Sequence, residues 1–274
     1  MYDYKTPPGW GDTFFQYVFD AVGAGLVNGT SYFQKGVQVN DGQFLLRYWA
    51  GLGTIAEGLQ LYDWLGRKFA SDFMTLGNGA FGQKGQMVVL PEVVYPENGN
   101  IRFDLQSVVQ AVGGAASQLV FTGVRRRRGV VSDPVPSNYR YYEKEYSIPY
   151  TLVVPDPAVT GTTQFIVPIT DFDFELRRME LENPVGFVTD SGFKILMYDT
   201  NWIQLANKPV LANQFFHMSN PGAVLNVGQL GFWPCPPLLY RVNGVIRFDV
   251  SGVTGAGAQT YQILFKGVRR IPCS

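Results

Sequence analysis

The sequence is poor in charged residues. They make up 16% of the chain, and 22 basic residues balance 22 acidic ones, so the net charge at pH 7 is zero. A protein that works mainly by binding nucleic acid usually carries a basic excess. We therefore expect no sequence-specific nucleic-acid partner. The one basic run, Arg125 to Arg128, is interpreted first as a solvated linker start or a source of salt bridges between subunits, and second as a contact for nucleic acid or an acidic partner.

Histidine is almost absent. A Ser-His-Asp or Cys-His catalytic group would have to use His217, and its surroundings, "NQFFHMSN", do not resemble a nucleophile elbow. A structural zinc site needs four Cys or His ligands, and the chain has three such residues. We therefore expect neither an enzyme nor a cofactor.

Cysteine is also scarce. Cys235 and Cys273 are too few for a disulfide framework, although both lie in the C-terminal part of the chain and could meet in space. We expect two thiols, and the sequence leaves open whether they pair.

No hydrophobic run is long enough to cross a bilayer. The stretch from Phe14 to Val27, "FFQYVFDAVGAGLV", contains Asp20 and two glycines. It predicts a short helix that packs on its own protein or a neighbour, and it is the only segment through which we expect membrane contact. The first residues, "MYDYKTPPGW", lack the basic and apolar regions of a secretory signal.

Aromatic residues and turn formers are abundant instead. The chain has 20 Phe, 15 Tyr, 31 Gly and 17 Pro. Aromatic residues favour strands, and glycine and proline favour the turns between them. This composition predicts an all-β protein.

Several blocks of sequence occur twice in the same order. The longest pair is "PEVVYPENGNIRFD" from Pro91 and "PPLLYRVNGVIRFD" from Pro236. It is followed by "QLVFTGVRR" from Gln118 and "QILFKGVRR" from Gln262. Shorter matches precede it, starting at Gly82 and Gly228, Leu61 and Met197, and Asp41 and Asp171. The spacing drifts as loop insertions would make it drift. We infer a tandem duplication with a first unit at 1–128, a linker at 129–145 and a second unit at 146–274.

Each unit is predicted to be a β-sandwich. "VIRFDV" alternates, so Arg247 and Asp249 share one face of a strand, and Asn-Gly before it predicts a hairpin turn. About eight short strands per unit predict two eight-stranded jelly rolls or β-sandwiches with a short N-terminal helix. Arg102 with Asp104, and Arg247 with Asp249, occur in both copies, so we interpret them as structural residues.

One acidic cluster is a minor candidate for a metal site. Asp171, Asp173 and Glu175 are two positions apart and would project from one face of a strand. Carboxylates so placed suit a hard cation such as Ca²⁺. A solvated strand face beside Arg177 and Arg178 is the first interpretation, because the corresponding positions of the first unit do not repeat the cluster.

The tandem barrels resemble the double jelly-roll capsid proteins of bacterial viruses. The resemblance is carried by "FELRRMEL", "PPLLYRVNGVIRFDV" and "ILFKGVRR" in the second unit, and by their repeats in the first. It implies a structural protein of a bacteriophage virion, made in the host cytoplasm, which assembles with itself as a trimer and with other virion proteins. A capsid (shell) protein is the first expectation, and a collar, neck, tail or decoration component of a tailed phage is the alternative.

A carbohydrate-binding β-sandwich is the second alternative. Its aromatic platform would come from Trp202, Trp233, Tyr139, Tyr141 and Tyr142. Exposed aromatic residues serve protein interfaces equally well.

Assembly surfaces are expected in three places. They are the N-terminal segment, the arginine run and the Gly/Pro-rich loop "HMSNPGAVLNVGQLGFWPCPP". The candidate residues are Phe14, Phe15, Phe19, Arg125, Arg126, Arg127, Arg128, Phe232 and Trp233.

Overall fold

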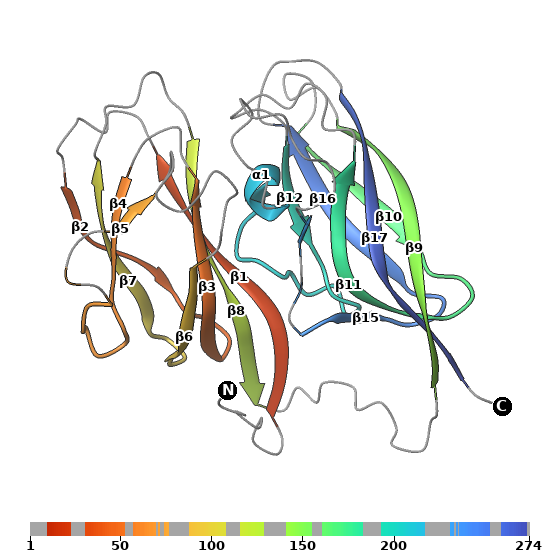
Figure 1. Ribbon diagram of the computed structural model, residues 1–274, viewed down its shortest axis with the longest axis horizontal. Coiled ribbons are helices and arrows are strands. Elements are labelled where there is room, and N and C mark those ends of the chain that lie inside the picture. The colour runs from red at the N-terminus through yellow and green to blue at the C-terminus, as the bar shows by residue number, and fades with distance from the viewer. Residues whose placement is uncertain are drawn as a thin grey trace.

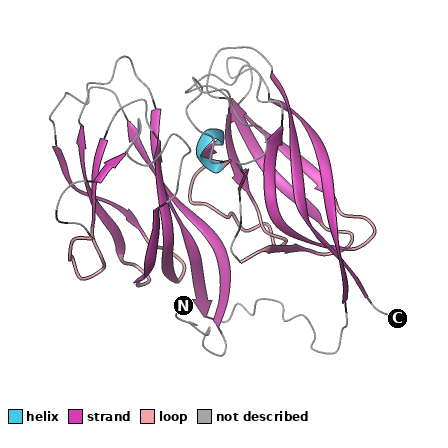
Figure 2. Cartoon of the chain, in the orientation of Figure 1, coloured by secondary structure: helices cyan, strands magenta, loops and turns pink. Residues whose placement is uncertain are grey.

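The structure is a computed structural model in which two β-barrels lie side by side (Figures 1 and 2). It describes residues 10–22, 31–52, 57–69, 71, 74–76, 88–107, 116–128, 141–154, 161–182, 193–216, 231–232, 234, 236–252 and 259–272. No helix in this described part is long and apolar enough to cross a membrane.

The first barrel contains two antiparallel sheets of four strands each. One sheet has the order β1-β8-β3-β6 and the other has the order β2-β7-β4-β5. The first sheet consists of β1 (Trp10–Val22), β8 (Ala116–Arg128), β3 (Gln43–Leu52) and β6 (Val88–Tyr95). The second sheet consists of β2 (Ser31–Gln38), β7 (Asn100–Ser107), β4 (Glu57–Leu61) and β5 (Met74–Leu76).

The second barrel repeats this arrangement. One sheet has the order β14-β11-β17-β9, with β15 also paired to β11, and the other has the order β10-β16-β12-β13. The first of these sheets consists of β14 (Gly231–Phe232), β11 (Asp173–Glu182), β17 (Gln259–Pro272), β9 (Tyr141–Val154) and β15 (Leu238–Tyr240). The other consists of β10 (Thr162–Pro168), β16 (Val245–Gly252), β12 (Phe193–Met197) and β13 (Val210–Leu211), and the helix α1 (Ala212–Phe215) follows β13.

Both barrels have the strand order of a jelly roll. In each barrel the last strand, which we call the closing strand (β8 or β17), lies between the barrel's first and third strands. In the other sheet, the barrel's second strand (β2 or β10) pairs with the strand that comes just before the closing strand in sequence (β7 or β16). This order is the double Greek key in which the chain passes back and forth between two sheets. The prediction of an all-β chain is confirmed, and the four sheets are those expected of jelly-roll units.

The same turn joins corresponding strands of the two barrels. Asn98 and Asn243 precede β7 and β16 with φ angles of 64° and 62°. The N–H of Asn98 donates to the carbonyl of Val39 at 2.8 Å, and that of Asn243 to the carbonyl of Ile169 at 2.7 Å. Asparagine tolerates this left-handed conformation, which explains why Asn-Gly stands at both turns.

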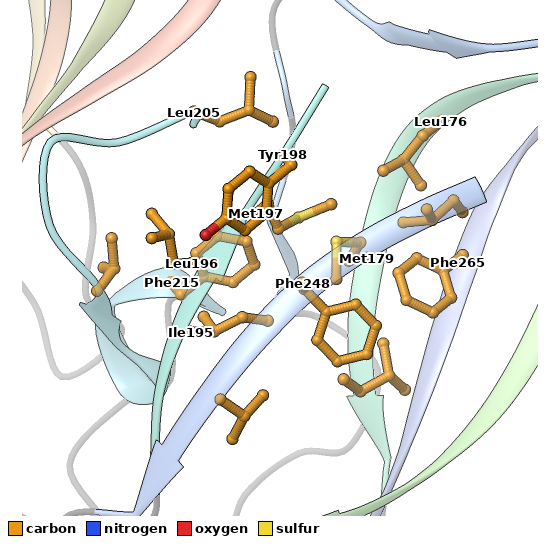
Figure 3. Close-up of a cluster of buried hydrophobic side chains, with 14 of the residues drawn as sticks. Leu176, Met179, Ile195, Leu196, Met197, Tyr198, Leu205, Phe215, Phe248 and Phe265 are labelled. Atoms are coloured by element: carbon orange, nitrogen blue, oxygen red, sulfur yellow. The ribbon is translucent and has the colours of Figure 1, made fainter. Parts of the chain in front are cut away.

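Alternation along the strands builds a separate core in each barrel. On β16, Ile246, Phe248 and Val250 are fully buried and face the opposite sheet. Figure 3 shows this core between the two sheets, where Phe248 of β16 lies near Met179 of β11 and Phe265 of β17. The first barrel has its own cluster around Phe103 and Phe121, whose ring centroids lie 5.5 Å apart.

A glycine lets the closing strand pass a bulge in each barrel. The register of β3 against β8 shifts between Leu46 and Tyr48, and that of β11 against β17 shifts between Leu176 and Arg178. A Cβ placed on the glycine opposite each bulge would overlap a backbone carbonyl oxygen. Gly123 would overlap Leu45, and Gly267 would overlap Glu175.

The predicted N-terminal helix is wrong, because the segment forms β1. Phe15 and Tyr17 face the core of the first barrel, whereas Phe14 and Val18 face the second barrel. A strand buried on both faces reads as a continuous apolar run, and such a run does not show the alternation of an ordinary strand.

The described strands of the two barrels lie on either side of the predicted linker. β8 ends at Arg128, where the first unit was predicted to end, and β9 begins at Tyr141, inside the segment predicted as the linker. The domain boundaries themselves stay a prediction.

We expect Gly123→Ala to lower the free energy of unfolding by about 2 kcal/mol, in the range of overpacked cores. The added methyl group would overlap the backbone carbonyl of Leu45 and also meet the ring of Phe44. Chemical denaturation would measure the change. Gly161→Ala is the matched control, because nothing lies within 4 Å of a Cβ there. Equal stability of the two variants would contradict the close approach.

Candidate functional site: the junction between the two barrels

The outer face of β1 and β8 is covered by the second barrel. Phe14, Val18 and Val120 point away from the core of the first barrel and belong to the hydrophobic cluster of the second. Each of them is at most 2% exposed. Figure 1 shows β1 and β8 on the side of the first barrel that faces β12 and α1. The sheet is therefore buried on both faces, which is unusual for an antiparallel sheet.

A turn of the second barrel pairs with the free edge of β1. Gln16 and Ala206 form a parallel bridge. The N–H of Gln16 donates to the carbonyl of Leu205 at 2.9 Å, and the N–H of Asn207 donates to the carbonyl of Gln16 at 3.1 Å. We call this turn, residues 198–208, the docking turn. The stretch "WIQLA", residues 202–206, lies in this turn and not in a named strand.

The side chain of Asn207 continues the pairing. Its Oδ1 accepts the N–H of Val18 at 2.6 Å, and its amide donates to the carbonyl of Val18 at 3.3 Å. Next to it, the ammonium of Lys208 lies 3.2 Å from the carboxylate of Asp20. The edge of β1 is thus covered by backbone hydrogen bonds at Gln16, by the amide of Asn207 at Val18 and by an ion pair at Asp20.

Gln118 is the buried polar centre of the junction. It lies on β8 and is 2% exposed. Its amide donates to Asp20 at 2.8 Å and to the carbonyl of Pro209 at 3.1 Å, and its Oε1 accepts the N–H of Leu211 at 2.7 Å. One side chain therefore joins β8, β1 and β13, and its burial makes each bond costly to lose.

The phenylalanine candidates for assembly are buried within the chain. Phe14 does lie at an interface, but between the two barrels, and Phe15 is 4% exposed in the core of the first barrel. Phe19 packs against the same core, 5.0 Å from the ring of Phe103. Because β1 is covered on both faces, these three residues do not form an exposed assembly surface.

The arginine run belongs to β8 and not to a linker, so its interpretation as a linker start is wrong. Arg125 is buried, with its guanidinium 3.9 Å from the ring centroid of Phe15, and burial lowers its pKa to about 10. Arg126 holds Asp12 through two hydrogen bonds of 2.8 and 3.0 Å, and Arg127 donates to the carbonyl of Asp41 at 3.1 Å. These three arginines join strands within the first barrel. Arg128 is exposed at the end of β8.

The acidic cluster is occupied by protein donors. Asp173 accepts Arg241 and the N–H of Val242, both at 2.8 Å, and Glu175 pairs with Arg177 and Arg270. Asp171 accepts the hydroxyl of Thr170 at 3.1 Å. Within the described residues no group of three potential metal ligands comes together. The cluster thus serves the ion pairs of the β11–β17 face.

The repeated Arg-Asp pairs hold the turn after the fourth strand of each barrel. Tyr62 donates its hydroxyl to Asp104 at 2.6 Å, and Tyr198 donates to Asp249 at the same distance. Behind them, Tyr95 and Tyr240 donate to the backbone carbonyls of Tyr62 and Tyr198.

The arginine of each pair covers the same position of the turn. The guanidinium of Arg247 lies 4.1 Å from the ring of Tyr198 and 4.7 Å from the ring of Trp202. In the first barrel, Arg102 takes the space that a Cβ on Gly66 would need. Trp202 and Gly66 both have positive φ, 63° and 83°. In the second barrel this turn is the docking turn.

The remaining candidates are described only in part. Phe232 lies in β14, and its side chain falls outside the described residues. Trp233, Cys235, Cys273 and His217 also fall outside them. Exposed aromatic side chains are present at Trp202, which is 50% exposed, and at Trp64, which is 56% exposed.

Sequence reasoning missed the residues that make the junction. Gln16 and Asn207 do not belong to any motif. Gln118 begins a repeated block, but the matching Gln262 in the second unit gave no sign of a junction between barrels. One signal was available, because apolar residues at both parities of β1 indicate a strand that is buried on both faces.

We expect Gln118→Ala to lower the free energy of unfolding by about 3 kcal/mol, because buried groups of Pro209 and Leu211 lose their partner. Denaturant unfolding would measure this. Gln164→Ala makes the same change at an exposed position of β10, where we expect a change within about 0.5 kcal/mol. Similar losses in both variants would show that Gln118 does not hold the barrels together.

We expect Asp104→Asn to lower the pKa of Tyr62 from about 12 toward the ordinary value of 10. The hydrogen bond to Asp104 is the main cause that raises this pKa, whereas burial is the main cause for Tyr198. Asp249→Asn should therefore lower the pKa of Tyr198 less. NMR titration with ¹³Cζ-labelled tyrosine would measure both.

The same bond makes stability depend on pH. The folded state holds the Tyr62 proton more tightly than the unfolded state, so the stabilisation is present below pH 10 and is lost as the pH rises to about 12. An unchanged pKa of Tyr62 in Asp104→Asn would contradict this assignment.

No family model matches the chain, and no curated protein matches it. Among solved structures, the chain is similar to one from Sulfolobus turreted icosahedral virus, with 8% identity and a TM-score of 0.28, over 93% of this chain and 60% of that one. It is similar to the major capsid protein P2 from bacteriophage PM2, with 9% identity and a TM-score of 0.25, over 96% and 98% of the two chains. A third is PBCV-1 VP54 fitted into a reconstruction of the virophage Sputnik, with 8% identity and a TM-score of 0.27, over 97% of each chain.

Proposed function

We propose that this chain is a structural protein of a virus particle, first of all a capsid (shell) protein, which assembles through the faces of its barrels. It would be made in the cytoplasm of the host, a bacterium in our proposal, and would act in the virion. Its partners would be further copies of itself, with a trimer first, and other virion proteins.

The observation that carries the proposal is the pair of jelly-roll barrels joined by a buried junction. Both have jelly-roll strand order, a fold used by viral capsid and lectin domains. The apolar outer face of one barrel meets the docking turn of the other, so the contact joins two different surfaces. A contact of this kind can be repeated from copy to copy, and it closes a ring when the rotation allows.

The fold alone does not select the function, so the contacts matter. The barrels are joined by buried apolar side chains and by hydrogen bonds of Gln16, Gln118 and Asn207. A junction of this kind holds two barrels at a fixed angle, which a shell subunit needs in order to tile a surface. A trimer of such chains would place six barrels in a ring with a nearly hexagonal outline.

Carbohydrate binding is the second candidate, and the exposed tryptophans favour it. Trp202 is 50% exposed and lies 4.7 Å from the guanidinium of Arg247. Aromatic faces beside polar groups are suited to sugar rings. Trp64 is exposed at the corresponding turn of the first barrel.

We expect the purified chain to form a trimer with a roughly hexagonal outline. Light scattering would give its mass, and negative-stain images of the same sample would give its outline. A ring of another order would favour the collar, neck, tail or decoration role. A chain that stays monomeric at all concentrations would contradict self-assembly, and glycan binding would then be tested with Trp202→Ala.

A further inference from the structure

The strand β9 of the second barrel corresponds to β1 of the first. Each is the first strand of its barrel and pairs along the whole closing strand. Gln16 lies opposite Thr122, and Ser147 lies opposite Lys266. Thr122 and Lys266 each precede the close-packed glycine of the closing strand, so Ser147 occupies the position of Gln16.

The two strands differ in what covers them. The edge of β1 is closed by the docking turn, and its residues from Phe14 to Val18 are buried. Among the described strands, β9 is the last of its sheet and has a neighbour on one side only. Its exposed residues are Lys144, Glu145, Tyr146, Ser147, Pro149, Thr151 and Val153. A long exposed edge strand is a template for pairing with another chain.

The first barrel carries a turn of the same construction as the docking turn. Tyr62 bridges to Lys68 as Tyr198 bridges to Gln204. The N–H of Phe69 donates to the carbonyl of Leu61 at 3.0 Å, and in the docking turn Leu205 donates to Met197 at 2.9 Å. Phe69 and Ser71 therefore correspond to Leu205 and Asn207.

This first-barrel turn, described at residues 62–69 and 71, leaves large apolar side chains exposed. Trp64 and Leu65 are 56% and 55% exposed. Phe69 is partly exposed, whereas its counterpart Leu205 is 3% exposed. Each of the two contact surfaces therefore occurs twice in the chain. The β1 edge and the docking turn contact each other, whereas the β9 edge and the first-barrel turn make no such contact within the described residues.

We propose that the edge of β9 in one copy of this chain is closed by the first-barrel turn of a second copy, by the contact that the docking turn makes with β1. This inference rests on the proposed self-assembly and adds its contact surfaces and register. The two copies would meet head to tail.

The proposed contact between β9 and the first-barrel turn would bring opposite charges together if it had the register of the contact between β1 and the docking turn. Gln16 and Ala206 form an isolated parallel bridge. Extending this parallel register by two residues on each strand would place the residue two positions before Ser147 beside the residue that corresponds to Gln204. These two are Glu145 and Lys68, and both are exposed. A carboxylate would therefore face an ammonium across the contact.

A second pair of contacting positions, Val18 and Asn207, is replaced by Pro149 and Ser71 in the proposed contact, and the new pair can still form a hydrogen bond. In the contact between β1 and the docking turn, Asn207 accepts the N–H of Val18 and also donates to its carbonyl. Pro149 replaces Val18 in β9 and has no N–H to donate. Ser71 replaces Asn207, and its hydroxyl can donate to the carbonyl that proline retains.

The arrangement of layers selects a second copy as the partner. Figure 1 shows four sheets in a row, in which β2-β7-β4-β5 and β9-β17-β11 are the outermost. The first-barrel turn belongs to the outermost sheet at one end, and β9 belongs to the outermost sheet at the other. By strand order these two ends correspond to the two surfaces that meet at the junction, although the β11–β17 face carries ion pairs where the β1–β8 face is apolar, so an added copy would continue the row of sheets.

Charge reversal tests the register. We expect Lys68→Glu and Glu145→Lys each to weaken self-association about tenfold in sedimentation velocity, because each change replaces an attraction by a repulsion. The double variant should restore the association. Lys144→Glu is the matched control on the same strand, and we expect little change because its side chain points to the other side of β9.

Cross-linking reads the contact itself, in a background with Cys235→Ser and Cys273→Ser. A 1:1 mixture of Ser71→Cys and Ser147→Cys chains, treated with a short bismaleimide, should give dimers of mixed composition. Ile166→Cys, at an exposed position of the edge strand β10, replaces Ser147→Cys in the control mixture and should give none.

The outcomes separate this inference from the proposed function. A trimer that ignores both charge reversals and gives no mixed dimer overturns the β9 contact and leaves self-assembly intact. A wild-type chain without a stable oligomer overturns the proposed assembly. In that case a mixed dimer still supports the β9 contact, and its absence overturns it.

Discussion

The sheet that contains β1 and β8 must be covered on both faces, and the arrangement of the two barrels depends on this. Phe14, Val18 and Val120 would be exposed to water in an isolated first barrel, and burying an apolar side chain of this size contributes about 1.5–3 kcal/mol. The docking turn supplies both the apolar cover and the backbone partners of the β1 edge. Separating the barrels would lose both at once, so the junction fixes their relative position.

The two barrels share a fold and differ where they face outward. On the first, the outer face of β8 carries Val120 and is apolar because a barrel covers it. On the second, the corresponding face carries ion pairs, in which Glu175 holds Arg270 and Glu180 holds Lys266. Ion pairs keep such a face compatible with water, and they contribute little to stability when exposed.

The fold was accessible to sequence reasoning where one face of a strand is buried. The turns at Asn98 and Asn243 and the alternation of β16 were predicted from local pattern. The strand β1 was predicted as a helix because both of its faces are apolar, and Arg125 was assigned to a linker because its burial against Phe15 depends on tertiary packing. The junction escaped prediction for the same reason, since Gln118 gains its partners only when two distant segments meet.

A chain of two joined barrels has a kinetic and a geometric advantage in building a ring. Half of the barrel-to-barrel contacts are already made within each chain, so only the other half depend on protein concentration. The internal contact also sets the rotation from one barrel to the next, and a head-to-tail contact closes only if that rotation divides a full turn. In the proposed ring the internal and external contacts would use corresponding strands and turns, so a rigid junction would direct the curvature of the whole ring. The hydrogen bonds of Gln118 would then act beyond stability, since they would fix the angle that each further copy repeats.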